Sequence, residues 1–158
     1  LDLKIVSVDP APRAEIDALC DEVIRRPLET LDLAVIDQLE SGDILMVDNS
    51  HRCSQNSDVE VTFLEILPRL KPGVLVYIDD IYLPCDYPPK WAERYYSEQY
   101  LLGVLLLADA GRRYELLFPG FFVCTDQALR EAAERFWKGL GIGPCMPDAN
   151  GFWMRVKG

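Results

Sequence analysis

Short apolar runs of strand length recur along this chain, with helix-like stretches between them. Three such runs, at residues 3–8, 44–47 and 74–78, are rich in β-branched side chains. The runs at 44–47 and 74–78 are continuous rather than alternating, which is typical of parallel strands buried on both faces. Two later runs, at 114–118 and 152–156, predict strands near the C-terminal end of the sequence.

The segments between the first predicted strands have apolar residues at helical spacing. Residues 16–24 repeat apolar side chains at helical spacing, so we expect a helix there. Pro27 should end it. Ser57 and Glu60 have the spacing of a capping box and predict the start of a second helix. The Lys-Pro-Gly sequence at 71–73 is expected to end it.

The rest of the chain is less regular. A helix is expected over residues 91–108, and a last helix should begin after Thr125 or Asp126, either of which could cap it. Residues 121–124 fit a continuation of the preceding strand or a short partner to it. Residues 28–39 are ambiguous and fit a short strand followed by a helical turn.

Strands that alternate with helices predict an α/β fold with a mostly parallel sheet and helices on both faces. The chain of 158 residues is 49% hydrophobic, enough for one buried core, so we interpret residues 1–158 as a single domain.

Composition narrows the possible partners. The formal net charge is −10 and no basic patch is visible, which argues against binding to nucleic acid. No apolar run reaches the length of a membrane span, so no membrane partner is expected. The five cysteines are odd in number and widely spaced, a pattern that suits reduced thiols in a cytoplasmic protein.

Acidic residues follow three of the predicted strands. Asp9, Asp48 and the pair Asp79–Asp80 each stand directly after an apolar run. Ligands of such sheets bind at the carboxyl ends of the strands, so we expect these acids to line one cleft together with His51. Their side chains should be partly exposed there, because a buried carboxylate needs a partner.

Each of these residues has two interpretations. Asp9 fits an acid that accepts hydrogen bonds from a ribose, and equally a cap of the following helix. Converging carboxylates at Asp48, Asp79 and Asp80 could hold Mg²⁺, or could be solvated and cap nearby backbone groups. His51, the only histidine, could be a general base or a loop histidine bonded to the backbone.

The central block resembles a known family. The sequence DILMVDNSH at residues 43–51 and the stretch FLEILPRLKPGVLVYIDDIY at residues 63–82 are similar to the class I S-adenosylmethionine-dependent methyltransferases, in a bacterial subgroup with a strand-end D-x-x-H motif. The resemblance implies a three-layer Rossmann-like sheet whose closing strand, at 152–156, is antiparallel. It also implies a substrate lid and a following helix, which resemble those of the subgroup at Leu83-Pro84, Asp86-Tyr87-Pro88, Trp91 and Glu98-Gln99-Tyr100.

The resemblance also implies roles for the strand-end residues. Asp9 would hold the ribose of S-adenosylmethionine. In metal-dependent relatives, acids at the positions of Asp48, Asp79 and Asp80 would hold Mg²⁺. Because His51 lies beside these acids at the same edge of the sheet, we expect His51 and Asp48 to be the catalytic residues.

The family's first strand and its glycine-rich turn, which cradles the cofactor, are not found in these residues. We therefore expect a truncated domain with the first strand missing from the sheet. One hypothesis is methyl transfer to a hydroxyl of a small molecule or sugar in the intact parent protein. The alternative is a non-catalytic α/β association module that binds no cofactor. The unpaired strand edges could be satisfied in two ways. The strand that ends at Asp9 could pair with the one that ends at Asp48 within one chain, or a second copy could supply the partner, and we expect the resulting homodimer.

Overall fold

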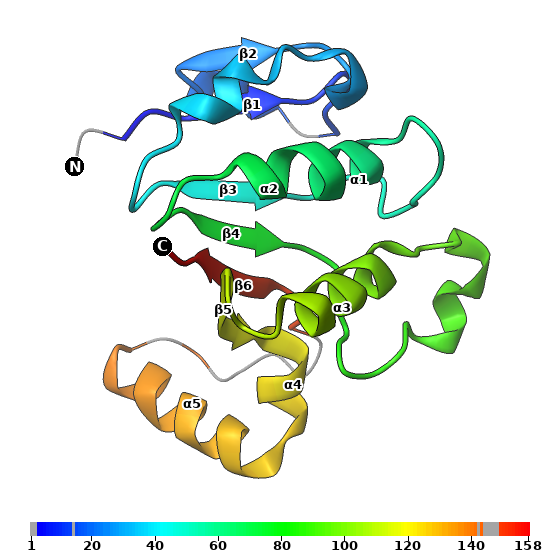
Figure 1. The fold of residues 1–158 in the computed structure, drawn as a ribbon. Coiled ribbons are helices and arrows are strands. Elements are labelled where there is room, and N and C mark those ends of the chain that lie inside the picture. The colour runs from blue at the N-terminus through cyan, green and yellow to red at the C-terminus, as the bar shows by residue number, and fades with distance from the viewer. Residues whose placement is uncertain (1–2, 14, 142, 144–148) are drawn as a thin grey trace.

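The fold consists of two sheets and the helices packed against them. A computed structural model describes residues 3–13, 15–141, 143 and 149–158. The larger sheet has the strand order β3-β4-β6-β5, and the smaller one pairs β1 with β2 (Figure 1). The strands are β1 (Val6–Val8), β2 (Glu22–Ile24), β3 (Ile44–Val47), β4 (Leu75–Ile78), β5 (Tyr114–Pro119) and β6 (Phe152–Val156).

The larger sheet is mixed. β3 and β4 are parallel, whereas β6 lies between β4 and β5 and is antiparallel to both. The predicted α/β class and the antiparallel closing strand are therefore confirmed. The expectation of a mostly parallel sheet is wrong for this sheet, because two of its three strand pairings are antiparallel. The description of β3 as fully buried is wrong, because the side chains of Ile44 and Met46 are 48% and 68% exposed. Both lie on the sheet face opposite Val47, which packs into the core.

The N-terminal segment differs from the prediction. A short 3₁₀-helix, η1 (Asp17–Leu19), and then β2 replace the expected helix over 16–24. Val6 pairs with Glu22 and Val8 with Ile24 in a parallel register. The apolar spacing also fits a strand at its end, where the β-branched Val23 and Ile24 favour extended backbone.

As a consequence, the strand that ends at Asp9 does not share a sheet with those that end at Asp48 and Asp79. β1 pairs with β2, while β3 pairs with β4 and, among the described residues, has a strand partner on that side only. Our expectation that these three strands lie in one sheet is wrong. The single wider sheet, for which we expected helices on both faces, is not formed among the described residues.

The connection between the two sheets is helical. It contains the 3₁₀-helices η2 (Leu28–Thr30) and η3 (Leu33–Gln38), and the side chain of Asp32 accepts a hydrogen bond from Ala34 N to begin η3. The short strand expected within residues 28–39 is therefore not present, whereas the helical turn is.

A continuous helical segment covers one face of the larger sheet. It consists of α1 (Asp58–Val61), a π-helical turn η4 (Thr62–Ile66) and α2 (Leu67–Arg69). Ser57 caps it as predicted by accepting a hydrogen bond from Glu60 N at 3.2 Å. Pro68 has no N–H to donate to the preceding turn, which explains the widened π turn before it.

The helix expected over 91–108 is divided in two. A 3₁₀-helix, η5 (Pro89–Arg94), precedes α3 (Glu98–Asp109), and Tyr95 between them adopts a left-handed backbone with φ of 56°. The break places the first residues of α3, Glu98 and Gln99, in the buried interior.

The C-terminal part also contains one helix more than expected. α4 (Gly120–Thr125) replaces the strand predicted at 121–124, because Pro119-Gly120 ends β5. α5 (Gln127–Gly139) follows, and Asp126 caps it by accepting a hydrogen bond from Leu129 N.

Cysteine chemistry corrects one expectation. Cys20, Cys53 and Cys85 carry free thiols, but Cys124 is disulfide-bonded, so the prediction that all the thiols are reduced is wrong. A disulfide suits an oxidising compartment better than the cytoplasm. The cytoplasmic location stays a prediction.

Candidate functional site

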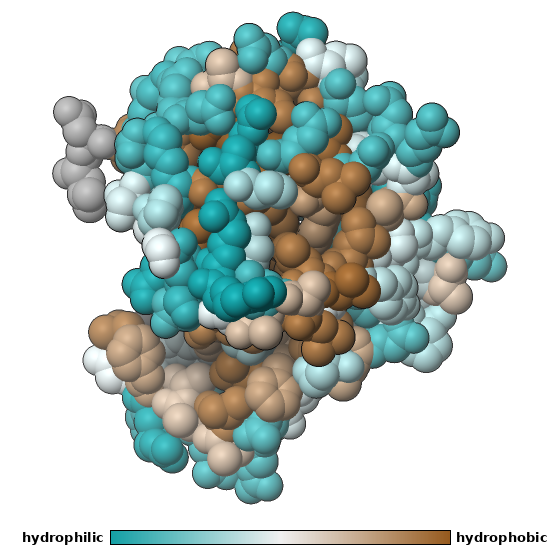
Figure 2. Space-filling view, viewed as in Figure 1, coloured by the Kyte–Doolittle hydropathy of each residue, from teal (hydrophilic) through white to brown (hydrophobic). Residues whose placement is uncertain are grey.

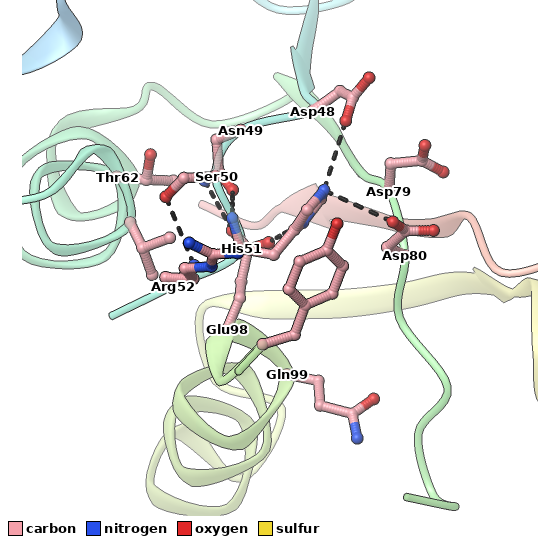
Figure 3. Close-up of polar contacts among 12 residues, drawn as sticks. Asp48, Asn49, Ser50, His51, Arg52, Thr62, Asp79, Asp80, Glu98 and Gln99 are labelled. Carbon is pink, nitrogen blue, oxygen red and sulfur yellow. Dashed lines mark hydrogen bonds and ion pairs between the residues drawn. The ribbon is translucent and has the colours of Figure 1, made fainter. Parts of the chain in front are cut away.

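The strands β3 and β4 end side by side, and the residues that follow them form the candidate site (Figure 3). Asp48 to His51 follow β3, and Asp79 and Asp80 follow β4. His51 and Asp80 both adopt left-handed backbone conformations, with φ of 57° and 55°. These turns direct the side chains of two adjacent loops toward one another.

His51 is the centre of the site. Its side chain is buried, with 4% of the residue exposed. Its Nδ1 lies 2.9 Å from Oε2 of Glu98, and its Nε2 lies 3.4 Å from Asp48 Oδ1 and 3.5 Å from Asp80 Oδ2. The predicted convergence of Asp48, His51 and Asp80 is thus observed, whereas the partial exposure expected of His51 is wrong.

Glu98 holds the imidazole in place. Its carboxylate is completely buried at the start of α3 and accepts a second hydrogen bond from Asn49 Nδ2 at 2.8 Å. A carboxylate beside Nδ1 favours the tautomer that carries its proton on that nitrogen. Nε2 is then the nitrogen that can accept a proton, and it is directed toward Asp48 and Asp80.

The surrounding charges shift the pKa of His51. Burial lowers its pKa, but the hydrogen bond and the charge of Glu98, with the charges of Asp80 and Asp48, outweigh burial and raise the pKa above its ordinary value of 6.5. Burial also raises the pKa of Asp80, while the nearby imidazole opposes this rise. An imidazole with a raised pKa is a stronger base.

The three acids proposed as metal ligands are not equivalent. Asp48 and Asp80 both face Nε2 of His51, whereas Asp79 accepts a hydrogen bond from the hydroxyl of Tyr77 at 2.7 Å. In the part of the chain that the structure describes, no group of three or more ligating side chains is spaced to hold an ion. The arrangement fits an imidazolium between two carboxylates better than Mg²⁺.

Asp9 lies apart in the two-stranded sheet. Its Oδ1 accepts a hydrogen bond from Ala11 N at 2.8 Å, but the next helix, η1, begins only at Asp17, so the interpretation of Asp9 as a helix cap is wrong. The structure does not bring Asp9 into contact with Asp48, His51 or Asp80. Its role toward a ribose stays a prediction.

Sequence reasoning missed Glu98 and Asn49 as site residues. Glu98 is 47 positions from His51, and it begins a helix whose other side chains are mostly apolar. A single acid at the start of the helix that follows the lid segment was the available signal. Its partner could not be identified without the tertiary structure.

Comparison with known proteins adds no assignment. No family model, curated protein or solved structure gives a significant match to this chain. Within the described residues, every helix is too short or too polar to cross a membrane.

Proposed function

We propose that this chain is a methyltransferase-like domain in which His51 takes a proton from an acceptor hydroxyl. The observation that carries the proposal is the buried His51–Glu98 pair at the ends of β3 and β4. Glu98 fixes the imidazole through Nδ1, and Nε2 faces the carboxyl edge of the sheet at which ligands of parallel strands bind. General bases are recognised by this geometry first and by their pKa second.

S-adenosylmethionine would supply the methyl group as an activated sulfonium. The acceptor oxygen would form a bond to the methyl carbon as the carbon–sulfur bond breaks, and Nε2 of His51 would take the hydroxyl proton. The resulting imidazolium lies beside three carboxylates, those of Glu98, Asp48 and Asp80, which stabilise its charge. No step requires a metal ion.

Two further features support this proposal. The antiparallel β6 between β4 and β5 agrees with the closing strand that the family resemblance implies. Asp9 ends β1, the strand whose acid would hold the ribose in that family. A Rossmann-like core of the methyltransferase type, formed by the four-stranded sheet alone, is part of the proposal.

The experiment that tests the proposal is a thermal shift with S-adenosylhomocysteine, the product of the donor. A ligand that binds only the folded chain raises its melting temperature, by an amount that grows with ligand concentration. Adenosine and homocysteine together serve as the control. An unchanged melting temperature up to millimolar S-adenosylhomocysteine would remove the methyl donor from the proposal.

One observation favours the second candidate, an association module. Exposed apolar side chains occur on several elements, and Figure 2 shows hydrophobic residues over α3 and the helical segment at 58–69. Leu64, Val104 and Leu107 are exposed there, Leu107 by 83%. We therefore retain a homodimer as part of this alternative.

A further inference from the structure

A cavity of about 660 Å³ lies beside the loop that follows β4. Its walls include the aromatic rings of Tyr82, Tyr87, Trp91 and Phe121. Small-molecule sites in proteins have volumes of this order and combine a mostly apolar lining with a few polar groups. The cavity therefore has the size and character of a ligand site.

The first turn of α3 builds the wall of this cavity. The buried Gln99 accepts a hydrogen bond from Tyr82 N at 2.9 Å through Oε1, and its own N–H donates to the Tyr87 hydroxyl at 3.2 Å. Its Nε2 donates to Cys85 O at 3.4 Å. Glu98, the preceding residue, fixes His51. One helical turn thus positions both the base and the cavity.

Two paths of contact join the cavity to His51. Asn150, in the cavity wall, donates from Nδ2 to Asp80 Oδ1 at 2.6 Å, and Oδ2 of Asp80 faces His51. The Tyr96 ring lies 4.6 Å from the imidazole and also contacts the rings of Tyr87 and Trp91. The cavity is therefore linked to the proposed base through Asn150 and Asp80 on one path and through Tyr96 on the other.

The rings form a cup rather than a flat slot. Tyr82 meets Trp91 at an interplanar angle of 84° and Tyr87 at 64°. Only Tyr87 and Trp91 are close to parallel, at 28°, and their centroids lie 6.3 Å apart, so they stack on each other and leave no slot for a planar ligand between their faces. The polarised C–H groups of a saturated ring can instead contact the negative faces of several differently oriented aromatic rings.

The polar groups of the cavity are of both charges. Asp86 contributes a carboxylate, Lys90 an ammonium group and Asn150 an amide. Hydrogen bonds from the Tyr100 hydroxyl and from Tyr87 N lower the pKa of Asp86, so it remains ionised near neutral pH. A neutral ligand with many hydroxyls can use both the donors and the acceptors. A cation would be repelled by Lys90, and an anion would be repelled by Asp86.

We propose that this cavity binds a pyranose ring, and that the methyl acceptor is a hydroxyl of a saccharide. The inference rests on the proposed function for the transfer step only. Binding of the ring requires neither S-adenosylmethionine nor His51, so the two proposals fail separately.

Saturation-transfer NMR on the whole chain tests it, with methyl glycosides of glucose, galactose, mannose and rhamnose as probes. Irradiation of the protein should saturate the ring C–H protons of at least one glycoside. Catechol and choline, which represent a planar phenol and a cation, should give no comparable signal. Trp91→Ala should weaken glycoside binding about tenfold through loss of its ring. Trp137→Ala, which changes a ring on α5 outside the cavity, should leave it unchanged.

Several results would overturn the inference. They are the absence of a saturation-transfer signal for all four glycosides, a stronger signal from catechol or choline, and undiminished glycoside binding by Trp91→Ala. If that variant does not fold, Asp86→Asn takes its place, since Asp86 is exposed and the amide can still accept from Tyr87 N. Glycoside binding without any thermal shift by S-adenosylhomocysteine would retain the saccharide site and reject the methyl donor.

Discussion

The carboxylate of Glu98 accepts a hydrogen bond from Nδ1 of His51 across 2.9 Å, with both side chains excluded from solvent. This contact joins the loop after β3 to the start of α3. It orients the only imidazole of the chain and gives the buried carboxylate a partner.

Loss of this carboxylate should destabilise the fold. Glu98→Ala leaves Nδ1 of His51 and Nδ2 of Asn49 without their acceptor and creates a cavity, so we expect a loss of about 3 kcal/mol in the free energy of unfolding. Urea denaturation measures this value. The exposed Glu93 provides the matched control, and Glu93→Ala should change the free energy by less than about 0.5 kcal/mol. Equal losses in the two variants would contradict the account.

Stability should also depend on pH through His51. Its pKa is raised in the folded chain, so the folded state binds more protons than the unfolded state between 6.5 and the raised value. The stabilising contribution is therefore complete below pH 6.5 and is lost as pH rises through the folded pKa. Denaturation at a series of pH values from 6 to 9 should show this decline. His51→Gln should flatten it, and an equally steep decline in that variant would assign it to another group.

The proposed chemistry separates binding from transfer. His51→Gln removes the base but no group expected to hold the methyl donor. We expect methyl transfer to a saccharide to fall at least about 100-fold, which is the usual contribution of a general base. The thermal shift by S-adenosylhomocysteine should persist. In the wild type, the rate should rise with pH as His51 loses its proton. Full activity of His51→Gln would exclude His51 as the base.

Association should depend on the free edge of β3. Asp43 O and Val47 O accept hydrogen bonds from Leu75 N and Asp79 N of the neighbouring strand. Because successive residues of a strand direct their N–H and C=O groups to opposite sides, those of Met46 are directed away from β4. Light scattering at micromolar concentration should show a dimer, and Met46→Pro should weaken it by removing an edge donor. An unchanged dimer would place the interface elsewhere, and a monomeric wild type would contradict the dimer prediction.

Sequence patterns predicted the local features and failed on long-range pairing. The capping box at Ser57, the cap at Asp126 and the strands β3, β4 and β6 follow from spacing within a few residues. β2 was not predicted, because the spacing of Val23 and Ile24 also suits a helix, and only the pairing with β1 favours a strand. For the site, parallel strands brought Asp48 and Asp80 together as expected. The position of Glu98 beside His51 depends on the break in the helix at Tyr95, and no local pattern predicted that break.

The most direct test of the central claim is an NMR titration of the imidazole nitrogens, which is unambiguous because the chain has one histidine. The account predicts a proton on Nδ1 in the neutral form and a pKa above 6.5. In Glu98→Gln the pKa should fall below the wild-type value, since burial then opposes the charged form with less compensation. A proton on Nε2, or a pKa that is the same in both proteins, would contradict the claim that Glu98 holds His51 as a base.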